Sequence, residues 1–247
     1  MLNLSEWYQS AVGRYVVDWE LDTIDDAVAD VFGFHAVQFG SAGIDFLRAN
    51  RIPLRLRLDM PRSGVEIGGR FTELPLASAS IDLVVLPHVL EFSAEPHQIL
   101  REVERVLMPE GQVVISGFNP FSLWGLKRQR RRSSEFPWRG DFISLLRLKD
   151  WLKLLGLELN GGSFGRYVPP VAQEKWLHRW SFLEAAGGRW WPFAGAIYVV
   201  RARKRVNGMR LVAPPWRSVE ARRRRLAVVS QRDDVPARRG AARRDSQ

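Results

Sequence analysis

The 247-residue chain contains no cysteine, and this absence excludes several kinds of chemistry at once. Without thiols the chain has no disulfide, no thiol nucleophile, no thiolate-bound metal and no iron–sulfur cluster. Histidine is also scarce, and no two of the four have the i, i+3 or i, i+4 spacing that brings two metal ligands onto one helix face. We therefore expect no metal site. The four histidines are His35, His88, His97 and His178.

Long hydrophobic runs are missing as well. No 18 consecutive residues are apolar, so the sequence predicts no membrane-spanning helix. The N-terminus lacks the basic segment followed by an apolar stretch that marks a secretory signal. Hydrophobic residues still make up 46% of the chain and charged residues 26%, enough for one good-sized domain with a tail or two small domains. We expect a soluble, cytoplasmic protein.

Acidic residues are too few to balance the basic ones, and the formal net charge of +10 is unevenly distributed. Residues 207–247 contain 11 arginines, no lysine and four acidic residues, so they carry +7 and leave +3 for residues 1–206. This tail has few large apolar side chains to offset its ordering entropy, and we predict that it is disordered. A second basic run, residues 127–134, predicts an exposed, mobile loop. The loop and the tail would suit nucleic acid or an anionic membrane surface.

Hydrophobic periodicity predicts alternating strands and helices in the remainder of the chain. Helical spacing covers residues 4–31 and ends at Gly33, and two more helices are predicted at residues 95–107 and 148–155, the latter ended by Gly156. Strands are predicted at residues 34–39, 54–58, 81–86, 112–117, 157–164 and 196–202. Strands joined by helical crossovers indicate an α/β domain with a mostly parallel sheet.

Ligands of open α/β sheets bind beyond the carboxyl ends of the strands. This rule selects residues 40–43, Asp59, residues 87–91 and residues 116–124 as candidates for a site. Asp82, by contrast, lies inside a predicted buried strand. We expect its carboxylate to cap neighbouring backbone or to pair with a helix arginine such as Arg105, since an unpaired buried carboxylate is costly.

Two consecutive segments carry a family resemblance. Residues 74–92 (LPLASASIDLVVLPHVLEF) and residues 100–115 (LREVERVLMPEGQVVI) contain a leucine–proline turn, a strand, a helix with Glu-x-x-Arg-Val-Leu, a Pro-x-Gly turn and a further strand. In this order and spacing the chain resembles class I S-adenosylmethionine-dependent methyltransferases, in particular the type 11 methyltransferase-domain group.

The resemblance implies a Rossmann-like fold in residues 1–206, with a seven-stranded, mostly parallel sheet flanked by helices and an N-terminal helical segment at residues 1–33. It implies S-adenosyl-L-methionine as the cofactor, without a metal. The cofactor-binding residues that it implies are Gly40, Ser41, Gly43, Asp59, Leu74, Pro87 and His88.

The chain departs from the family pattern at four positions. Gln38 stands where the family has an acidic residue before its glycine-rich loop, and Ala42 and Ile44 replace two of the loop's three glycines. Arg70 replaces an aspartate that would lie near the adenine. Asp59 and Leu74 are so close in sequence that we expect the second crossover helix to be shortened or lost.

The methyl acceptor is not identified by the sequence. His88, after a strand end, could take a proton from a substrate, pack against adenine or hold a loop. Asn119 is placed to line the substrate mouth. An aromatic and basic stretch from residue 175 to 193 suits core packing, a lid, a membrane-surface patch or single-stranded nucleic acid.

Methyl transfer from the cofactor to an unidentified acceptor is the predicted function. Two alternatives stay open: a catalytically inactive binding or scaffold protein with this fold, and a nucleic-acid-binding protein that acts through its arginine-rich loop and tail.

Overall fold

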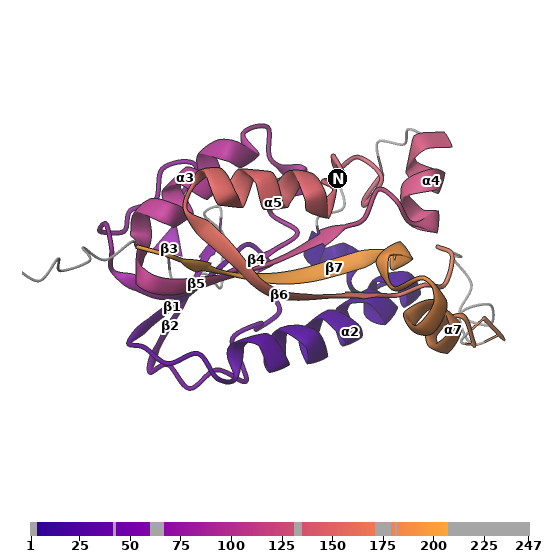
Figure 1. The fold of residues 1–247 in the computed structure, drawn as a ribbon, viewed down its shortest axis with the longest axis horizontal. Coiled ribbons are helices and arrows are strands. Elements are labelled where there is room, and N and C mark those ends of the chain that lie inside the picture. The colour runs from indigo at the N-terminus through magenta and orange to yellow at the C-terminus, as the bar shows by residue number, and fades with distance from the viewer. Residues whose placement is uncertain are drawn as a thin grey trace, which may run out of the picture. The chain divides into compact units, whose positions relative to one another are not determined.

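A seven-stranded sheet runs through the described residues in the order β3-β2-β1-β4-β5-β7-β6 (Figure 1). The computed structural model describes residues 4–41, 43–59, 67–130, 135–170, 179–180 and 182–206, and residues 1–206 form one compact unit. Neighbouring strands are parallel except where β7 pairs with β5 and β6. The predicted fold, a mostly parallel seven-stranded sheet flanked by helices, is confirmed.

The elements follow the predicted alternation closely. The strands are β1 (His35–Phe39), β2 (Leu54–Asp59), β3 (Ile67–Gly68), β4 (Ile81–Pro87), β5 (Leu107–Phe118), β6 (Leu157–Gly165) and β7 (Ile197–Lys204). The helices are α1 (Leu4–Trp7), α2 (Ala11–Val28), α3 (Pro96–Val106), α4 (Leu123–Arg130), α5 (Leu145–Leu154) and α7 (Phe182–Trp190), with 3-10 turns η1 (Leu90–Phe92) and η2 (Pro192–Ala194).

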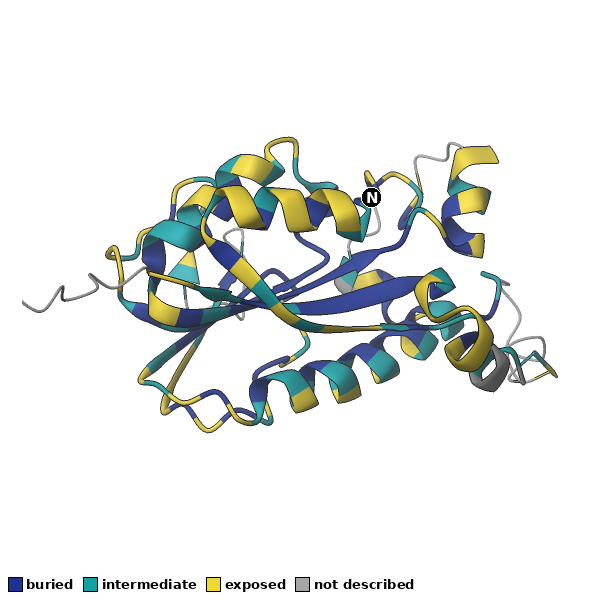
Figure 2. Cartoon of the chain, in the orientation of Figure 1, coloured by how far each residue is buried: buried dark blue, intermediate teal, exposed yellow. Residues whose placement is uncertain are grey.

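Strand β4 shows how the sheet separates two hydrophobic cores. Its side chains alternate between the faces, so Val84 and Leu86 pack with α3 and α5, whereas Leu83 and Val85 pack with α2. Figure 1 shows α3 and α5 on one side of the sheet and α2 on the other, and Figure 2 shows the central strands buried between them. A continuous apolar run is what a strand covered on both faces requires.

The N-terminal segment forms two helices instead of the single one predicted. α1 ends at Trp7, and the Ser10 side chain caps the start of α2 by accepting from the Gly13 backbone N–H at 3.0 Å. α2 ends at Val28, before Gly33, because the buried Asn50 amide donates to the carbonyl oxygens of Val28 and Val31. Side-chain capping thus sets both ends of this helix.

The basic run at residues 127–134 was predicted to be a loop, and this is wrong for its described part. Residues 127–130 belong to α4, and residues 131–134 lie outside the described residues. The helix is fixed at its start, where Ser122 Oγ accepts from the Gly125 N–H and the buried Trp124 indole donates to the Val168 carbonyl. The predicted tail, residues 207–247, also lies outside the described residues.

Strand β5 begins five residues earlier than predicted. α3 ends at Val106, and residues 109–111, expected to form a turn, lie inside β5 as an irregularity. Ile81 of β4 pairs with Leu107, whereas Leu83 pairs with Gln112, so the extra residues bulge out of the ladder.

Asp82, half-buried in β4, caps neighbouring backbone, which is one of the two structural roles predicted for it. Its Oδ2 accepts from the backbone N–H groups of Phe34 and His35, at 2.7 and 3.0 Å, where the chain enters β1. The alternative, a pair with Arg105, is wrong. That arginine instead pairs with Glu102 at 2.8 Å and donates to the Leu74 carbonyl oxygen, which ties α3 to the turn before β4.

Candidate functional site

A cavity of about 470 Å³ lies at the carboxyl ends of β1, β2 and β4. Gly40 and Ser41 line it after β1, Asp59 lines it at the end of β2, and Pro87 and His88 line it at the end of β4. All five were predicted to bind the cofactor. The structure therefore brings together, from three strands, residues that are up to 48 positions apart in sequence.

The other two predicted cofactor residues are not among those that line this cavity. Gly43 is exposed farther along the same loop. Leu74 is buried in the core that includes α3, and its backbone N–H donates to Glu102 Oε2 at 3.0 Å. The neighbouring residues Arg70 and Thr72 line the cavity in its place.

The turn after β1 keeps one side of the cavity open. Gly40 and Ser41 both have left-handed backbone, with φ of +71° and +51°. Glycine adopts this conformation without steric cost. A Cβ at position 40 would point at Val89 and Phe71, 3.5 and 3.8 Å away, and both of these residues also line the cavity.

Gln38 shapes this turn from beneath. The side chain is fully buried, and its Nε2 donates to the carbonyl oxygens of Gly40, Ser41 and Ile44, at 3.1, 3.3 and 2.8 Å. Its Oε1 accepts from the Phe46 N–H at 2.9 Å. An ionised acid has no donor for these carbonyl oxygens, so the amide is chemically matched to this loop. The described part of this crossover contains turns and no helix, and Gln38 binds three of its carbonyl oxygens.

The cavity wall fits the chemical parts of S-adenosylmethionine. The Ser41 hydroxyl is buried and has no hydrogen-bond partner among the described residues, so it is available to a ligand. Asp59 supplies a half-buried carboxylate, which is suited to accept from ribose hydroxyls. The Phe71 ring, stacked parallel on Phe39 at 5.7 Å between centroids, offers a flat apolar surface for a base.

A buried charged cluster supports the cavity from behind. His88 Nε2 lies 2.7 Å from Glu20 Oε1, and His88 Nδ1 contacts the Glu91 carboxylate. All three side chains are buried. Burial alone lowers the pKa of His88, but the two carboxylates outweigh this effect and raise the pKa from its ordinary 6.5 to about 10. His88 is therefore an imidazolium at neutral pH.

Each carboxylate of the cluster has a further donor. The Tyr8 hydroxyl donates to Glu20 at 2.8 Å, and the Phe118 backbone N–H donates to Glu91 at 2.9 Å. Burial and the Glu20 carboxylate together raise the pKa of Tyr8 well above its usual value, so this phenol stays protonated as a donor. The cluster joins the turn after α1, helix α2, the residue after β4, the turn η1 and strand β5 beneath the cavity.

The structure argues against His88 as a general base. An imidazolium with a carboxylate at each ring nitrogen has no lone pair to accept a substrate proton. The backbone of His88 has a left-handed φ of +52°, which directs the ring into the protein interior. Of the roles considered for this histidine, holding the loop is the one that this geometry supports.

Asn119 is likewise occupied by structural hydrogen bonds. Its Nδ2 donates to the carbonyl oxygens of Phe193 and Gly195, and its Oδ1 accepts from the Phe121 N–H. The side chain is buried and is not among the residues that line the cavity. Asn119 fastens the end of β5 to the loop before β7, and its place at the substrate mouth stays a prediction.

Sequence reasoning missed three residues that the fold brings to this region. Glu20 is an acid on the apolar face of α2, among Val16, Val17 and Ile24. An acid at such a position indicates a buried carboxylate with a partner, and this pattern could have identified it from the sequence. Phe71 and Arg139 also line the cavity. Their positions depend on tertiary contacts, and no local pattern marks them.

Comparison with known proteins agrees with the geometry of the site. A family profile described as "Methyltransferase domain" matches residues 43–115. The uncharacterized protein YafS of Escherichia coli (strain K12) is 30% identical over 166 residues, which cover 66% of this chain and 65% of that protein. The chain spans less than two thirds of the length of the curated relatives that it matches.

Solved structures share the fold at low sequence identity. A SAM-dependent methyltransferase of Thermotoga maritima has a TM-score of 0.56 at 18% identity, covering 78% of this chain and 97% of its own. One from Archaeoglobus fulgidus has a TM-score of 0.55 at 16% identity, with coverages of 77% and 94%. Together with the domain match, this fold implies S-adenosylmethionine as the cofactor, as predicted.

Proposed function

We propose that this chain, a class I S-adenosylmethionine-dependent methyltransferase by domain and fold, transfers a methyl group from that cofactor to an acceptor bound at the same edge of the sheet. One observation carries the proposal. The cavity at the carboxyl ends of β1, β2 and β4 combines the left-handed Gly40–Ser41 turn with the Asp59 carboxylate. This is where open α/β sheets bind their ligands.

The bound cofactor supplies a methyl group already activated on a sulfonium, so the protein needs little acid–base chemistry of its own. The chain's residues would instead bind and orient. Asp59 would accept hydrogen bonds from the ribose hydroxyls of the cofactor. The Gly40–Ser41 turn would leave room for its methionine part, and Phe71 would contact its adenine. Holding acceptor and methyl group in reactive geometry is then the main source of rate. Both ring nitrogens of His88 face carboxylates, which agrees with a reaction in which this histidine transfers no proton.

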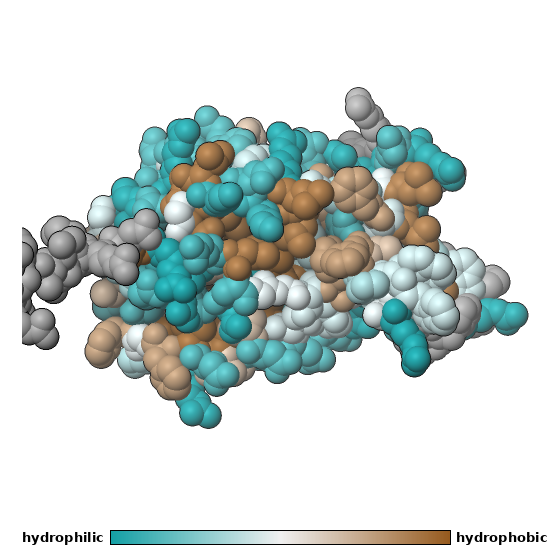
Figure 3. All heavy atoms as spheres, viewed as in Figure 1, coloured by the Kyte–Doolittle hydropathy of each residue, from teal (hydrophilic) through white to brown (hydrophobic). Residues whose placement is uncertain are grey.

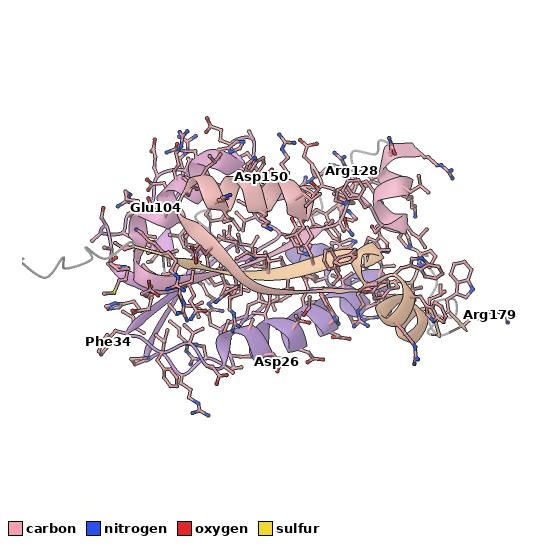
Figure 4. All side chains as sticks on the ribbon, viewed as in Figure 1. Asp26, Phe34, Glu104, Arg128, Asp150 and Arg179 are labelled. Atoms are coloured by element: carbon pink, nitrogen blue, oxygen red, sulfur yellow. The ribbon has the colours of Figure 1, made fainter. Side chains whose placement is uncertain are left out.

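Calorimetry with S-adenosylhomocysteine tests the proposal. The wild-type protein should bind, and Asp59→Ala should weaken binding by about 1.5–3 kcal/mol, or roughly ten- to a hundredfold, because it removes a charge-assisted acceptor. Asp150→Ala is the matched control, since Asp150 is exposed on α5 and does not line the cavity (Figure 4).

Two results would contradict the proposal in different ways. If the folded wild-type protein does not bind at millimolar cofactor, the enzyme is rejected in favour of a scaffold protein with this fold. If Asp59→Ala and Asp150→Ala bind equally well, the ribose is not held by Asp59, and the cofactor's placement in this cavity is wrong.

A further inference from the structure

Large apolar side chains are exposed together at one end of the structure. Phe121 precedes α4, Trp190 ends α7, and Trp191 and Phe193 follow it, and their exposed fractions are 73%, 70%, 66% and 74%. Leu123 and Leu126 of α4 are also exposed. α4 and α7 lie at the same end of the molecule (Figure 1), and Figure 3 shows hydrophobic atoms over α4 and pale, intermediate ones over α7. We call this surface the aromatic end.

Four of these side chains line one apolar pocket, which joins α4 to α7, and Trp190 and Phe193 are next to Trp191 and Ala194 of its wall in the sequence. Phe121, Leu123 and Leu126 form its α4 side, and Leu183 and Trp191 form its α7 side. The pocket has a volume of about 470 Å³ and is open to solvent. Exposed apolar patches that are rimmed by polar residues mark sites of interaction with proteins or membranes.

Cationic side chains belong to the same two helices or precede them in the sequence. Arg130 at the end of α4 and Arg189 in α7 are exposed, and Arg179 lies just before α7. The acid of α7, Glu184, is turned inward, where it accepts from the Tyr15 hydroxyl and from the Tyr167 backbone N–H at 2.9 Å. Glu184 thereby anchors α7 to the domain and leaves its outward side without that negative charge.

We propose that the aromatic end docks on the surface of an anionic lipid bilayer. Trp190, Trp191 and Phe193 would enter the boundary between headgroups and acyl chains, while Arg189 and Arg130 contact lipid phosphates. None of the helices in the described residues is long and apolar enough to span a membrane.

Three features favour lipid over single-stranded nucleic acid. Bases stack on aromatic rings, but they gain little from the aliphatic side chains of Leu123 and Leu126. An open pocket with apolar walls suits a hydrocarbon chain better than a base with polar edges. Tryptophan beside arginine is also the composition typical of membrane interfaces.

Sedimentation with vesicles tests the proposal, using the full chain so that residues 207–247 contribute equally to every variant. With equimolar phosphatidylcholine and phosphatidylglycerol, Trp190→Ser/Trp191→Ser should lower the vesicle partition coefficient by about tenfold or more, since the apolar contact is lost. Arg189→Glu should lower it most at low salt, where electrostatic attraction is least screened.

Phe32→Ser/Phe34→Ser is the matched control, because these two aromatics are 74% and 72% exposed but lie before β1. Figure 4 labels Phe34 and Arg179 at opposite ends of the molecule. This variant should bind vesicles like the wild type, and acyl chains carrying bromine should quench the fluorescence of the wild type more than that of the double tryptophan variant.

Three outcomes would overturn the proposal. In the first, the double tryptophan variant binds anionic vesicles as well as the wild type. In the second, the double phenylalanine variant loses as much binding as the tryptophan variant. In the third, the tryptophan variant keeps vesicle binding but loses binding to single-stranded RNA, which would assign the surface to nucleic acid.

Discussion

Charged side chains are usually exposed and large apolar ones buried, and the cofactor cavity and the aromatic end depart from this rule in opposite ways. Beneath the cavity, Glu20, His88 and Glu91 place three ionisable groups in the interior. At the aromatic end, Trp190 and Trp191 expose the largest apolar side chains to solvent. Buried charges and exposed apolar patches are the informative exceptions to the burial rule.

The comparison teaches that the two regions depend on the rest of the protein in different ways. Each buried charge is compensated by partners from several elements, so a change there should affect the whole domain. The exposed aromatics have few partners to lose. We therefore expect substitutions at the first region to reduce stability and substitutions at the second to reduce binding alone.

The largest effect is expected for His88→Asn. Removing the cation leaves the Glu20 and Glu91 carboxylates facing each other in the interior, and breaking a buried ion pair costs about 3–5 kcal/mol. Asparagine tolerates the left-handed backbone of this position, so the loss in the free energy of unfolding comes from the missing charge and not from backbone strain. Urea unfolding measures it, with His97→Asn as the exposed control. A loss of ~1 kcal/mol or less would mean that the cluster does not stabilise the fold.

A smaller loss is expected for Gln38→Glu. The carboxylate would face the carbonyl oxygens of Gly40, Ser41 and Ile44 without a proton to donate, at a cost of about 1–3 kcal/mol in the free energy of unfolding. Affinity for S-adenosylhomocysteine should fall as well, because the Gly40–Ser41 turn lines the cavity. Gln9→Glu, at an exposed glutamine, should change neither quantity. Unchanged stability and affinity in Gln38→Glu would refute the role given to this amide.

The pH dependence of stability should show the raised pKa of His88. Between pH 6.5, where an ordinary histidine loses its proton, and about 10, the folded state holds a proton that the unfolded state lacks. This stabilisation is complete below pH 6.5 and is lost as pH rises through 10, so the free energy of unfolding falls by up to ~1.4 kcal/mol per pH unit. His88→Asn should lack this slope. Parallel profiles of the two proteins from pH 7 to 9 would contradict the assignment.

The smallest effect on stability is expected at the aromatic end. Trp190→Ser/Trp191→Ser should change the free energy of unfolding by about 0.5 kcal/mol or less, as exposed positions usually do. Thermal unfolding checks this. A loss of several degrees would show that these tryptophans are packed in solution, and the comparison between the two regions would fail.

Much of the fold could be predicted from the sequence because local patterns determine it. The apolar run of β4 indicates a strand covered on both faces. A carboxylate in such a strand needs hydrogen-bond donors, and Asp82 has them in the backbone N–H groups of Phe34 and His35. α4 escaped prediction because tertiary and capping contacts, such as those of Trp124 and Ser122, stabilise it against a strongly basic composition. Helix boundaries depended in the same way on side-chain caps such as Asn50.

The site was predictable only where it follows from strand ends. Gly40, Asp59 and Pro87 could be located because parallel strands bring their carboxyl ends to one edge. The state of His88 could not, since it depends on Glu20, which is 68 residues away in the sequence. The opposite charges that hold a buried histidine come from other elements, and sequence spacing does not reveal them.

Hydrogen–deuterium exchange with saturating S-adenosylhomocysteine tests most directly that the cofactor binds in the cavity and not at the aromatic end. We expect slower exchange at residues 38–46, 54–59 and 86–92, which contain the cavity-lining residues at the ends of β1, β2 and β4, and at residues 67–74, which contain further residues that line the cavity. Exchange in α4 and α7 should stay unchanged. Slower exchange confined to α4 and α7, with none at the three strand ends, would contradict the placement of the cofactor.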